Sequence, residues 1–411
     1  MTADRLARRL GTPQAVVVGL SAMVGAGVYT AFAPAAAAAG GALPVALLLA
    51  AAVAYCNATS SARLAARYPE SGGTYVYGRE RLGPFWGYLA GWGFVVGKTA
   101  SCAAMTLTVV AYAAPGLGQP WRGVLAVAVV AAITTLDYRG VHRSTRAAAV
   151  LVTVSLLALA TAVVAALTAG DPQASGLDPA AGAGPWGVLE AAGLLFFAFA
   201  GYARVATLGE EVRDPERTIP RAVTWALGLV LAVYALVALA LLATLGPAGI
   251  ASAEDPVAAA VAATGLSGLV PVVRVGAVLA ALGALLALIL GVSRTVLAMA
   301  RDHHLPHGLA AVHPRFGVPH RAEVGVGVVV AVLAATVDLR EAIGFSSLAV
   351  LVYYAIANAS AFTLGYRLVP VAGFAGCLLL AANLPATSVL SGLVVLTLGA
   401  LAYTLRRRRS R

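Results

Sequence analysis

The sequence predicts an all-α polytopic membrane protein. Of its 411 residues, 60% are apolar and only 11% are charged, whereas soluble domains carry about 25% charged residues. The mean hydropathy is +0.88, and long uncharged stretches recur along the chain. These observations exclude soluble, collagen-like, disordered and disulfide-rich secreted classes. The three cysteines lie in apolar stretches without a CxxC pair, so we expect buried thiols and no metal ligands.

Twelve stretches are predicted to cross the bilayer, because a helix needs about 20 apolar residues to do so. They are residues 13–38, 41–62, 84–113, 121–136, 147–169, 186–207, 221–245, 269–299, 322–337, 342–366, 368–383 and 386–405. The ninth and eleventh are short, and a helical hairpin or a re-entrant segment in place of the eleventh is the alternative.

Basic residues gather on one side of these spans. Of the 28 lysines and arginines, 22 fall in the two termini and in the loops that follow even-numbered spans. Because cytoplasmic loops carry the excess of basic residues, residues 1–12 and 406–411 are predicted to be cytoplasmic termini of a cell-membrane protein. Two termini on the same side of the membrane require an even number of spans, and twelve satisfies this requirement. A nucleic-acid partner is not expected, since the basic residues are spread over several loops along one membrane face.

The first and sixth spans contain glycines that interrupt a helix at matching places. Gly25 and Gly27 lie in the first span and Gly201 lies in the sixth, at similar depth and five spans apart. Matched interruptions of this kind indicate a secondary transporter built from inverted repeats. An unwound helix offers N–H groups to a carboxylate and carbonyl groups to an ammonium, which suits an amino acid. The alternative is that these small residues only allow close helix packing.

Four motifs occur in an order typical of one transporter family. They are GLSAMVGAGVY in the first span, PESGGTYVY at residues 69–77, the long stretch at 196–222, and the paired segments 298–302 and 312–316. With these motifs the chain resembles the amino acid–polyamine–organocation superfamily from about residue 13 to residue 367. The resemblance implies a five-plus-five inverted repeat like that of the leucine transporter, with repeats at 13–170 and 171–367. Two further helices would occupy residues 368–405.

The resemblance also implies a substrate site built from the two interruptions. The implied residues are Ala22, Met23, Val24, Gly25, Ala26, Gly27, Phe197, Ala198, Phe199, Ala200 and Tyr202. In such an arrangement the N–H groups of residues 25–27 hold the substrate carboxylate. Carbonyls near residues 22–23 and 197–198 accept from the amino group, and the ring at position 199 or 202 forms an aromatic lid or wall.

Two positively charged side chains lie within the predicted spans. Lys98 is the only lysine of the chain and lies about fifteen residues into the third span, while Arg204 follows the sixth-span interruption. Ionisable residues at this depth are functional candidates. Our hypothesis is that Lys98 titrates or senses substrate and that Arg204 is a fixed charge bonded to exposed carbonyls. The alternative is that Lys98 only holds unwound carbonyls in place.

The coupling device of some proton-coupled relatives is missing. Those relatives place a lysine in the fifth helix opposite an acid after the sixth-helix break, and the matching positions here are Ser155 and Ala203. Proton coupling by that device is therefore not expected, and the coupled partner is either a proton or a sodium ion.

Acidic residues are expected only near the ends of the spans. Glu190 lies near an outer end, and Asp137, Glu210 and Glu211 lie near cytoplasmic ends. Two buried cations without a buried anion favour a neutral or an acidic amino acid as substrate. The mixed-charge loop that contains Glu210 and Glu211 is either a cytoplasmic gate or a solvated turn around Pro215.

No motif of an enzyme or of a metal site accompanies these features. The histidines between His303 and His320 are interrupted by Pro306 and are expected to form a loop. No cofactor is expected. The sequence thus predicts secondary active transport of an amino acid by alternating access in a lipid bilayer. An amino acid/amine exchanger and a non-transporting sensor are the alternatives.

Overall fold

The computed structural model describes residues 10–68, 72–140, 145–169, 184–206, 212–365 and 367–409, and the regular structure of these residues is helical. The α-helices are α1 (Thr12–Met23), α2 (Ala26–Thr30), α3 (Phe32–Ala39), α4 (Leu43–Arg67), α5 (Thr74–Leu82), α6 (Pro84–Ala113), α7 (Trp121–Tyr138), α8 (Thr145–Ala169), α9 (Pro185–Phe199), α10 (Ala203–Ala206), α11 (Pro215–Ser252), α12 (Pro256–Ala263), α13 (Val270–Arg301), α14 (His320–Thr336), α15 (Leu339–Phe362), α16 (Leu368–Ala382) and α17 (Ala386–Arg409). The 3₁₀ turns are η1 (Gly40–Ala42), η3 (Ala200–Tyr202), η4 (Ser267–Leu269) and η5 (His307–Ala310).

Within the described residues, nine helical segments are long and apolar enough to cross a membrane. The chain is therefore a multi-pass membrane protein, as its composition predicts. The predicted ninth and eleventh spans correspond to α14 and α16, which have only 17 and 15 residues. The predicted first span is divided, because α1 ends before α2 and α3 begin. The count of twelve spans stays a prediction.

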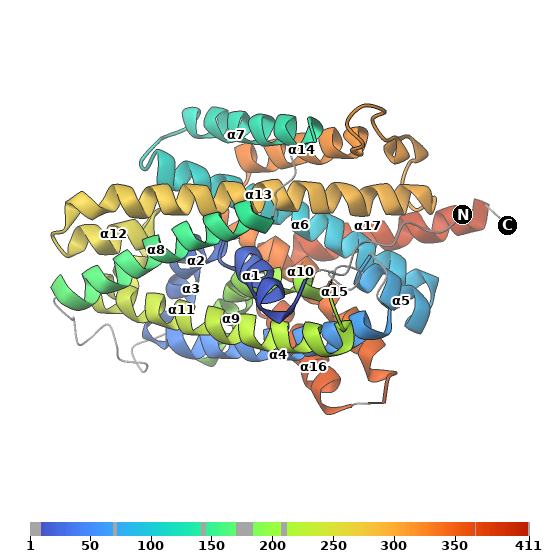
Figure 1. Ribbon diagram of the computed structural model, residues 1–411, viewed down its shortest axis with the longest axis horizontal. Coiled ribbons are helices and arrows are strands. Elements are labelled where there is room, and N and C mark those ends of the chain that lie inside the picture. Colours follow the sequence, from blue (N-terminus) through green and yellow to red (C-terminus); the bar gives the residue numbers. More distant parts are fainter. Residues whose placement is uncertain are drawn as a thin grey trace.

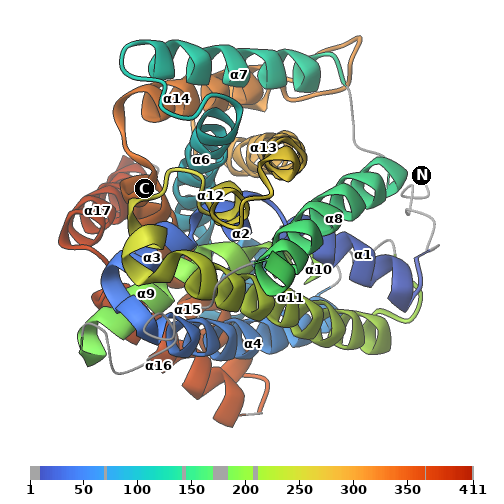
Figure 2. The ribbon, with the colours of Figure 1, turned by 90° about the vertical axis from the view of Figure 1, so that its left-hand side faces the viewer.

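The helices pack in layers around the divided first span (Figure 1). In the end-on view of Figure 2, α7 and α14 form an outer pair with α6 and α13 beneath it. The helices α4, α9 and α11 lie on the opposite side, and α1, α2 and α10 lie between the two groups. The interruptions predicted from glycine are thus enclosed by longer helices.

Small residues let these helices approach closely. A Cβ atom added at Gly97 of α6 would lie 2.8 Å from the Cβ of Ala349 in α15. Such contacts are typical of membrane helices, where packing rather than the hydrophobic effect drives association. A glycine also marks a bend within one helix. The helix α11 bends at Gly246, whose φ is 63°, directly before Pro247.

Candidate functional site

The first interruption lies between α1 and α2. Met23 ends α1 and Ala26 begins α2, and the intervening residues Val24 and Gly25 have non-helical backbone angles. The Gly25 N–H donates to the Met23 carbonyl at 2.8 Å. Since α2 begins anew at Ala26, its first N–H groups have no acceptor within the helix. All of these residues are buried.

The second interruption follows α9. The helix ends at Phe199, residues Ala200–Tyr202 form the 3₁₀ turn η3, and the short helix α10 follows. A 3₁₀ turn replaces i→i+4 hydrogen bonds by i→i+3 bonds, so the regular helical pattern stops here.

The two interruptions are packed directly against each other through glycines. A Cβ atom at Gly27 would lie 2.6 Å from the Cα of Ala198, so α2 touches the backbone of α9. A Cβ atom at Gly201 would overlap the carbonyl of Ala22 in α1. Each interruption therefore contributes one glycine that makes room for the backbone of the other.

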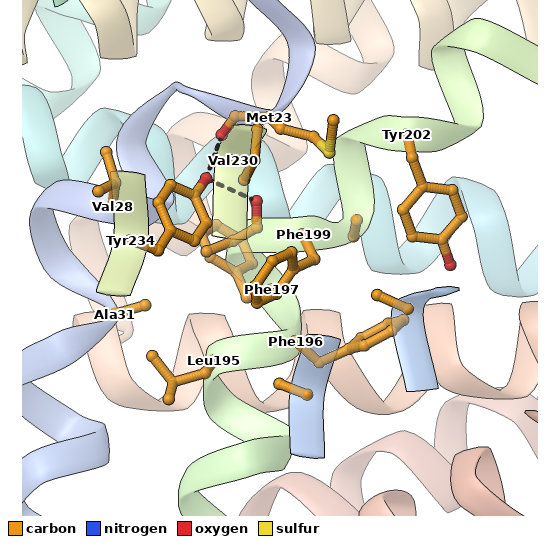
Figure 3. Close-up of a cluster of buried hydrophobic side chains, with 14 of the residues drawn as sticks. Met23, Val28, Ala31, Leu195, Phe196, Phe197, Phe199, Tyr202, Val230 and Tyr234 are labelled. Carbon is orange, nitrogen blue, oxygen red and sulfur yellow. Dashed lines mark hydrogen bonds between the residues drawn. The ribbon is translucent and has the colours of Figure 1, made fainter. Parts of the chain in front are cut away.

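A tyrosine of α11 joins the two interruptions. The hydroxyl of Tyr234 lies within hydrogen-bond distance of the carbonyl oxygens of Met23, at 2.7 Å, and Ala198, at 3.0 Å (Figure 3). Its side chain is fully buried. Two carbonyls from separate broken helices thus converge on one donor. The sequence interpretation missed this residue, although Tyr234 is the only polar side chain between residues 226 and 243.

The two aromatic residues expected to close the site point to different neighbours. Figure 3 shows Phe199 beside Tyr234, with ring centroids 5.2 Å apart, and Tyr202 farther along on the other side of η3. Tyr202 instead packs against Tyr354 of α15, with ring centroids 5.0 Å apart. Phe199 therefore lies near both interruptions, whereas Tyr202 joins the second interruption to α15.

Lys98 reaches the second interruption from α6. Its Nζ atom donates to the carbonyl of Ala200 at 3.3 Å, and the hydroxyl of Tyr354 lies 3.5 Å from the same oxygen. The lysine is buried and takes part in none of the ion pairs formed among the described residues. If Lys98 only holds unwound carbonyls in place, this contact is the one expected. A functional role of Lys98 stays a prediction.

The other residues considered for coupling lie in different surroundings. Ser155 of α8 contacts α2, because the hydroxyl of Tyr29 lies 3.0 Å from its Oγ atom. Arg204 of α10 has an exposed side chain, so the expectation of a second buried cation was wrong. Glu210 and Glu211 lie outside the described residues.

Two acidic residues lie at helix ends, as expected, but are buried, which was not expected. Asp137 of α7 and Glu323 of α14 are each 0% exposed. Asp137 does lie in the last turn of its helix, but neighbouring helices cover it. The charge argument for a neutral substrate, which counted two buried cations and no anion, therefore loses its basis. Among the described residues, no three histidine, cysteine, aspartate or glutamate side chains are arranged to hold a metal ion.

The geometry at the interruptions suits a small zwitterion. Free N–H groups at the start of α2 and carbonyls of α1, α9 and η3 lie close together in a buried setting, where hydrogen-bonding groups are costly to leave without partners. Backbone hydrogen-bond donors and acceptors are thereby concentrated between the two broken helices.

Comparisons with known proteins show the family of this chain. A family model described as amino acid permease matches residues 10–403. An uncharacterized transporter of Mycobacterium tuberculosis is 61% identical over 99% of this chain and 94% of its own length. A branched-chain amino acid permease of Bacillus subtilis is 26% identical, over 98% of this chain and 94% of its own. Cationic amino acid transporter 7, chloroplastic, of Arabidopsis thaliana is 27% identical, over 89% and 68%.

Proposed function

Because this chain belongs to the amino acid permease family, we propose that it performs secondary active transport of an amino acid by alternating access. The substrate would lie between the interruptions of α1–α2 and α9–α10. The observation that carries the proposal is the convergence of the Met23 and Ala198 carbonyls on the Tyr234 hydroxyl.

The proposed substrate contacts follow from the backbone groups at the interruptions. The N–H groups of Ala26 and Gly27 hold the carboxylate at the start of α2, together with the Gly25 N–H, which leaves the Met23 carbonyl when substrate binds. The ammonium group donates to the carbonyls near residues 22–23 and 197–198. In the described packing the Tyr234 hydroxyl occupies two of these acceptors, so binding exchanges a hydroxyl donor for a charged one. Val24 and Ala200 complete the two interruptions.

A neutral side chain is the proposed specificity. Phe196, Phe197 and Phe199 are buried at the second interruption, and Lys98 lies beside it. An apolar side chain gains by contact with these rings, whereas a cationic one meets the charge of Lys98. The relatives carry names for both branched-chain and cationic substrates. The aromatic surroundings and the buried lysine favour the neutral class.

We further propose the membrane arrangement that the loops indicate. The chain crosses the cell membrane twelve times with both termini in the cytoplasm, as a five-plus-five inverted repeat followed by α16 and α17. The concentration of arginines in the termini and in alternate loops supports this orientation. The short helices α14 and α16 are the ninth and eleventh spans.

Lys98 is the proposed link between the substrate site and coupling, because it bonds the carbonyl of Ala200 at the second interruption. Ser155, Arg204, Glu210 and Glu211 are proposed to act in coupling or gating around it. The coupled ion is a proton or sodium. Exchange of amino acids, and ligand sensing without transport, are the competing functions.

Uptake by purified protein in proteoliposomes tests the proposal. Labelled amino acids are supplied one at a time, with and without an imposed inward proton gradient, and then with a sodium gradient. Gly25→Leu protein is the blocked control, because its Cβ lies 3.0 Å from Ala284 and a larger side chain fills the interruption. Gradient-dependent accumulation supports a symporter. Uptake that requires internal amino acid supports an exchanger, and binding without any flux supports a sensor.

A further inference from the structure

A pair of buried carboxyl groups lies between α7 and α14, outside the proposed substrate site. The register of these helices is set by three contacts: Gly123 against Ala335, Thr134 against Gly327, and the ring of Tyr138 against that of His320. The helices run antiparallel, so this register places Asp137 level with Glu323. Figure 1 shows α7 and α14 side by side along the upper edge of the molecule.

These carboxyl groups are buried without hydrogen bonds. Both residues are 0% exposed, and all four carboxyl oxygens lack a hydrogen-bond partner among the described residues. The Oγ1 atom of Thr134 and the Nδ1 atom of His320, one turn to either side, are also buried and have no hydrogen-bond partner in the described part of the chain. Buried polar groups are normally satisfied, so four such side chains along one seam mark a polar site between α7 and α14.

Among the described residues, the ionised pair carries one negative charge more than the cation beside it. Asp137 and Glu323 interact electrostatically with each other and with Arg294 of α13. Arg294 is exposed, and it forms no ion pair within 4.0 Å of either carboxylate among the described residues. Two buried carboxylates and one arginine carry a net charge of −1. An unpaired buried charge costs several kcal/mol even after relaxation, and binding of one cation removes it.

A proton fits this place best. Two like charges close together in a buried setting repel each other, so protonation of one carboxylate relieves this repulsion. A metal ion prefers more ligands than this seam provides, and no group of three metal-binding side chains exists in the described residues.

We propose that Asp137 and Glu323 together bind one proton, and that this proton is the ion coupled to substrate movement. The coupling part rests on the proposed transport function. On binding, the proton goes to an oxygen of one carboxylate and leaves a single negative charge shared by the pair opposite Arg294. On release it returns to water and restores the second negative charge, which repels the first across the seam between α7 and α14.

The pair is connected to the substrate site through α6. Cys102 of α6 packs in one hydrophobic cluster with Ile133 of α7 and Ala322 of α14, and Lys98 lies one turn away from Cys102 on the same helix. Lys98 in turn bonds the Ala200 carbonyl at the second interruption. A displacement of α7 or α14 on protonation of the pair is therefore transmitted through α6 to the one lysine that contacts the proposed substrate site. Within the described residues, the titratable or charged groups near the pair are Cys102 from α6, Tyr138 from α7, Arg294 from α13 and His320 from α14.

Infrared titration of the purified protein tests proton binding without any transport. We expect the carbonyl stretch of a protonated carboxylic acid to persist near neutral pH and to be lost in Asp137→Asn and in Glu323→Gln. Glu341→Gln removes an exposed carboxylate and is the matched control, which retains the band. A spectrum without this band in the unmodified protein, or a band that both variants retain, overturns the proton site.

Transport by the same variants tests the coupling. We expect Asp137→Asn and Glu323→Gln to lose accumulation driven by a proton gradient and to keep the exchange of internal for external amino acid, which also shows that they are folded. Retained accumulation overturns the coupling, as does loss of exchange in both variants. If a sodium gradient drives accumulation and the two variants lose it, the site binds sodium and the proposal of a proton site is overturned. If the unmodified protein transports nothing, the proposed function fails and infrared titration alone decides the proton site.

Discussion

The contact between Gly27 of α2 and Ala198 of α9 makes a direct prediction for Gly27→Ala. The added Cβ atom would lie 2.6 Å from the Cα and 2.8 Å from the Cβ of Ala198. Ordinary contacts begin at 3.4 Å, so the two interruptions must separate by about 0.8 Å, the difference between 3.4 and 2.6 Å. The obstructing atoms belong to the backbone and the Cβ of another helix and have no rotamer to change.

The energetic cost can be worked from this overlap. Overpacking of a close-packed core costs about 1–3 kcal/mol, and an immovable neighbour places Gly27→Ala in the upper part of that range. Alanine returns up to about 1 kcal/mol of helix propensity over glycine. We therefore expect a net loss of about 2 kcal/mol of stability. Uptake should fall as well, because the displaced backbones carry the proposed substrate contacts.

Thermal unfolding in detergent and uptake into proteoliposomes measure the two effects. Gly291→Ala is the matched control, because a Cβ atom at this position of α13 meets no atom within 4 Å. It should leave uptake unchanged and the melting temperature equal or slightly higher. If Gly27→Ala behaves like Gly291→Ala in both assays, the two interruptions are not in direct contact and the site described above is wrong.

Three further predictions concern single polar groups. Tyr234→Phe removes the donor shared by two carbonyls. It should lower the free energy of unfolding by about 0.6–1.7 kcal/mol, the range for hydrogen bonds within membranes. Thermal unfolding measures this loss, and an unchanged melting temperature contradicts it. Lys98→Met should abolish uptake and Lys98→Arg should alter its pH profile, because arginine does not release its proton; unchanged transport and pH profile in both variants refute a role for Lys98. Burial lowers the pKa of the His304 ring below its usual 6.5, and this effect is larger than the opposite effect of the Asp302 carboxylate. The neutral ring therefore stabilises the fold above pH 6.5, and this stability is lost as the pH falls below that value. His304→Gln should flatten the acid-side fall in melting temperature, and an unaltered fall would assign it to other groups.

Much of the fold follows from local sequence. The predicted span 84–113 has the bounds of α6, because Gly83 and Pro84 start the helix and an uninterrupted apolar stretch continues it. The two interruptions were also predictable, since glycine weakens a helix wherever it stands. The predicted span 221–245 ends directly before the break of α11 at Gly246, whereas the helix begins earlier, at Pro215, because hydropathy marks only the apolar part of a helix.

Family membership and the positions of the two interruptions were thus determined by the sequence, because hydropathy, glycine content and short motifs are local properties. Burial and hydrogen bonding were decided only by the tertiary structure. Tyr234 reaches a carbonyl 211 positions away in the chain, and Asp137 and Glu323 come from helices separated by α8 to α13. Arg204, which the sequence places inside a span, is exposed. Depth along one helix does not reveal which side of that helix a neighbour will cover, and this side determines whether a charge is paired, solvated or held without a partner.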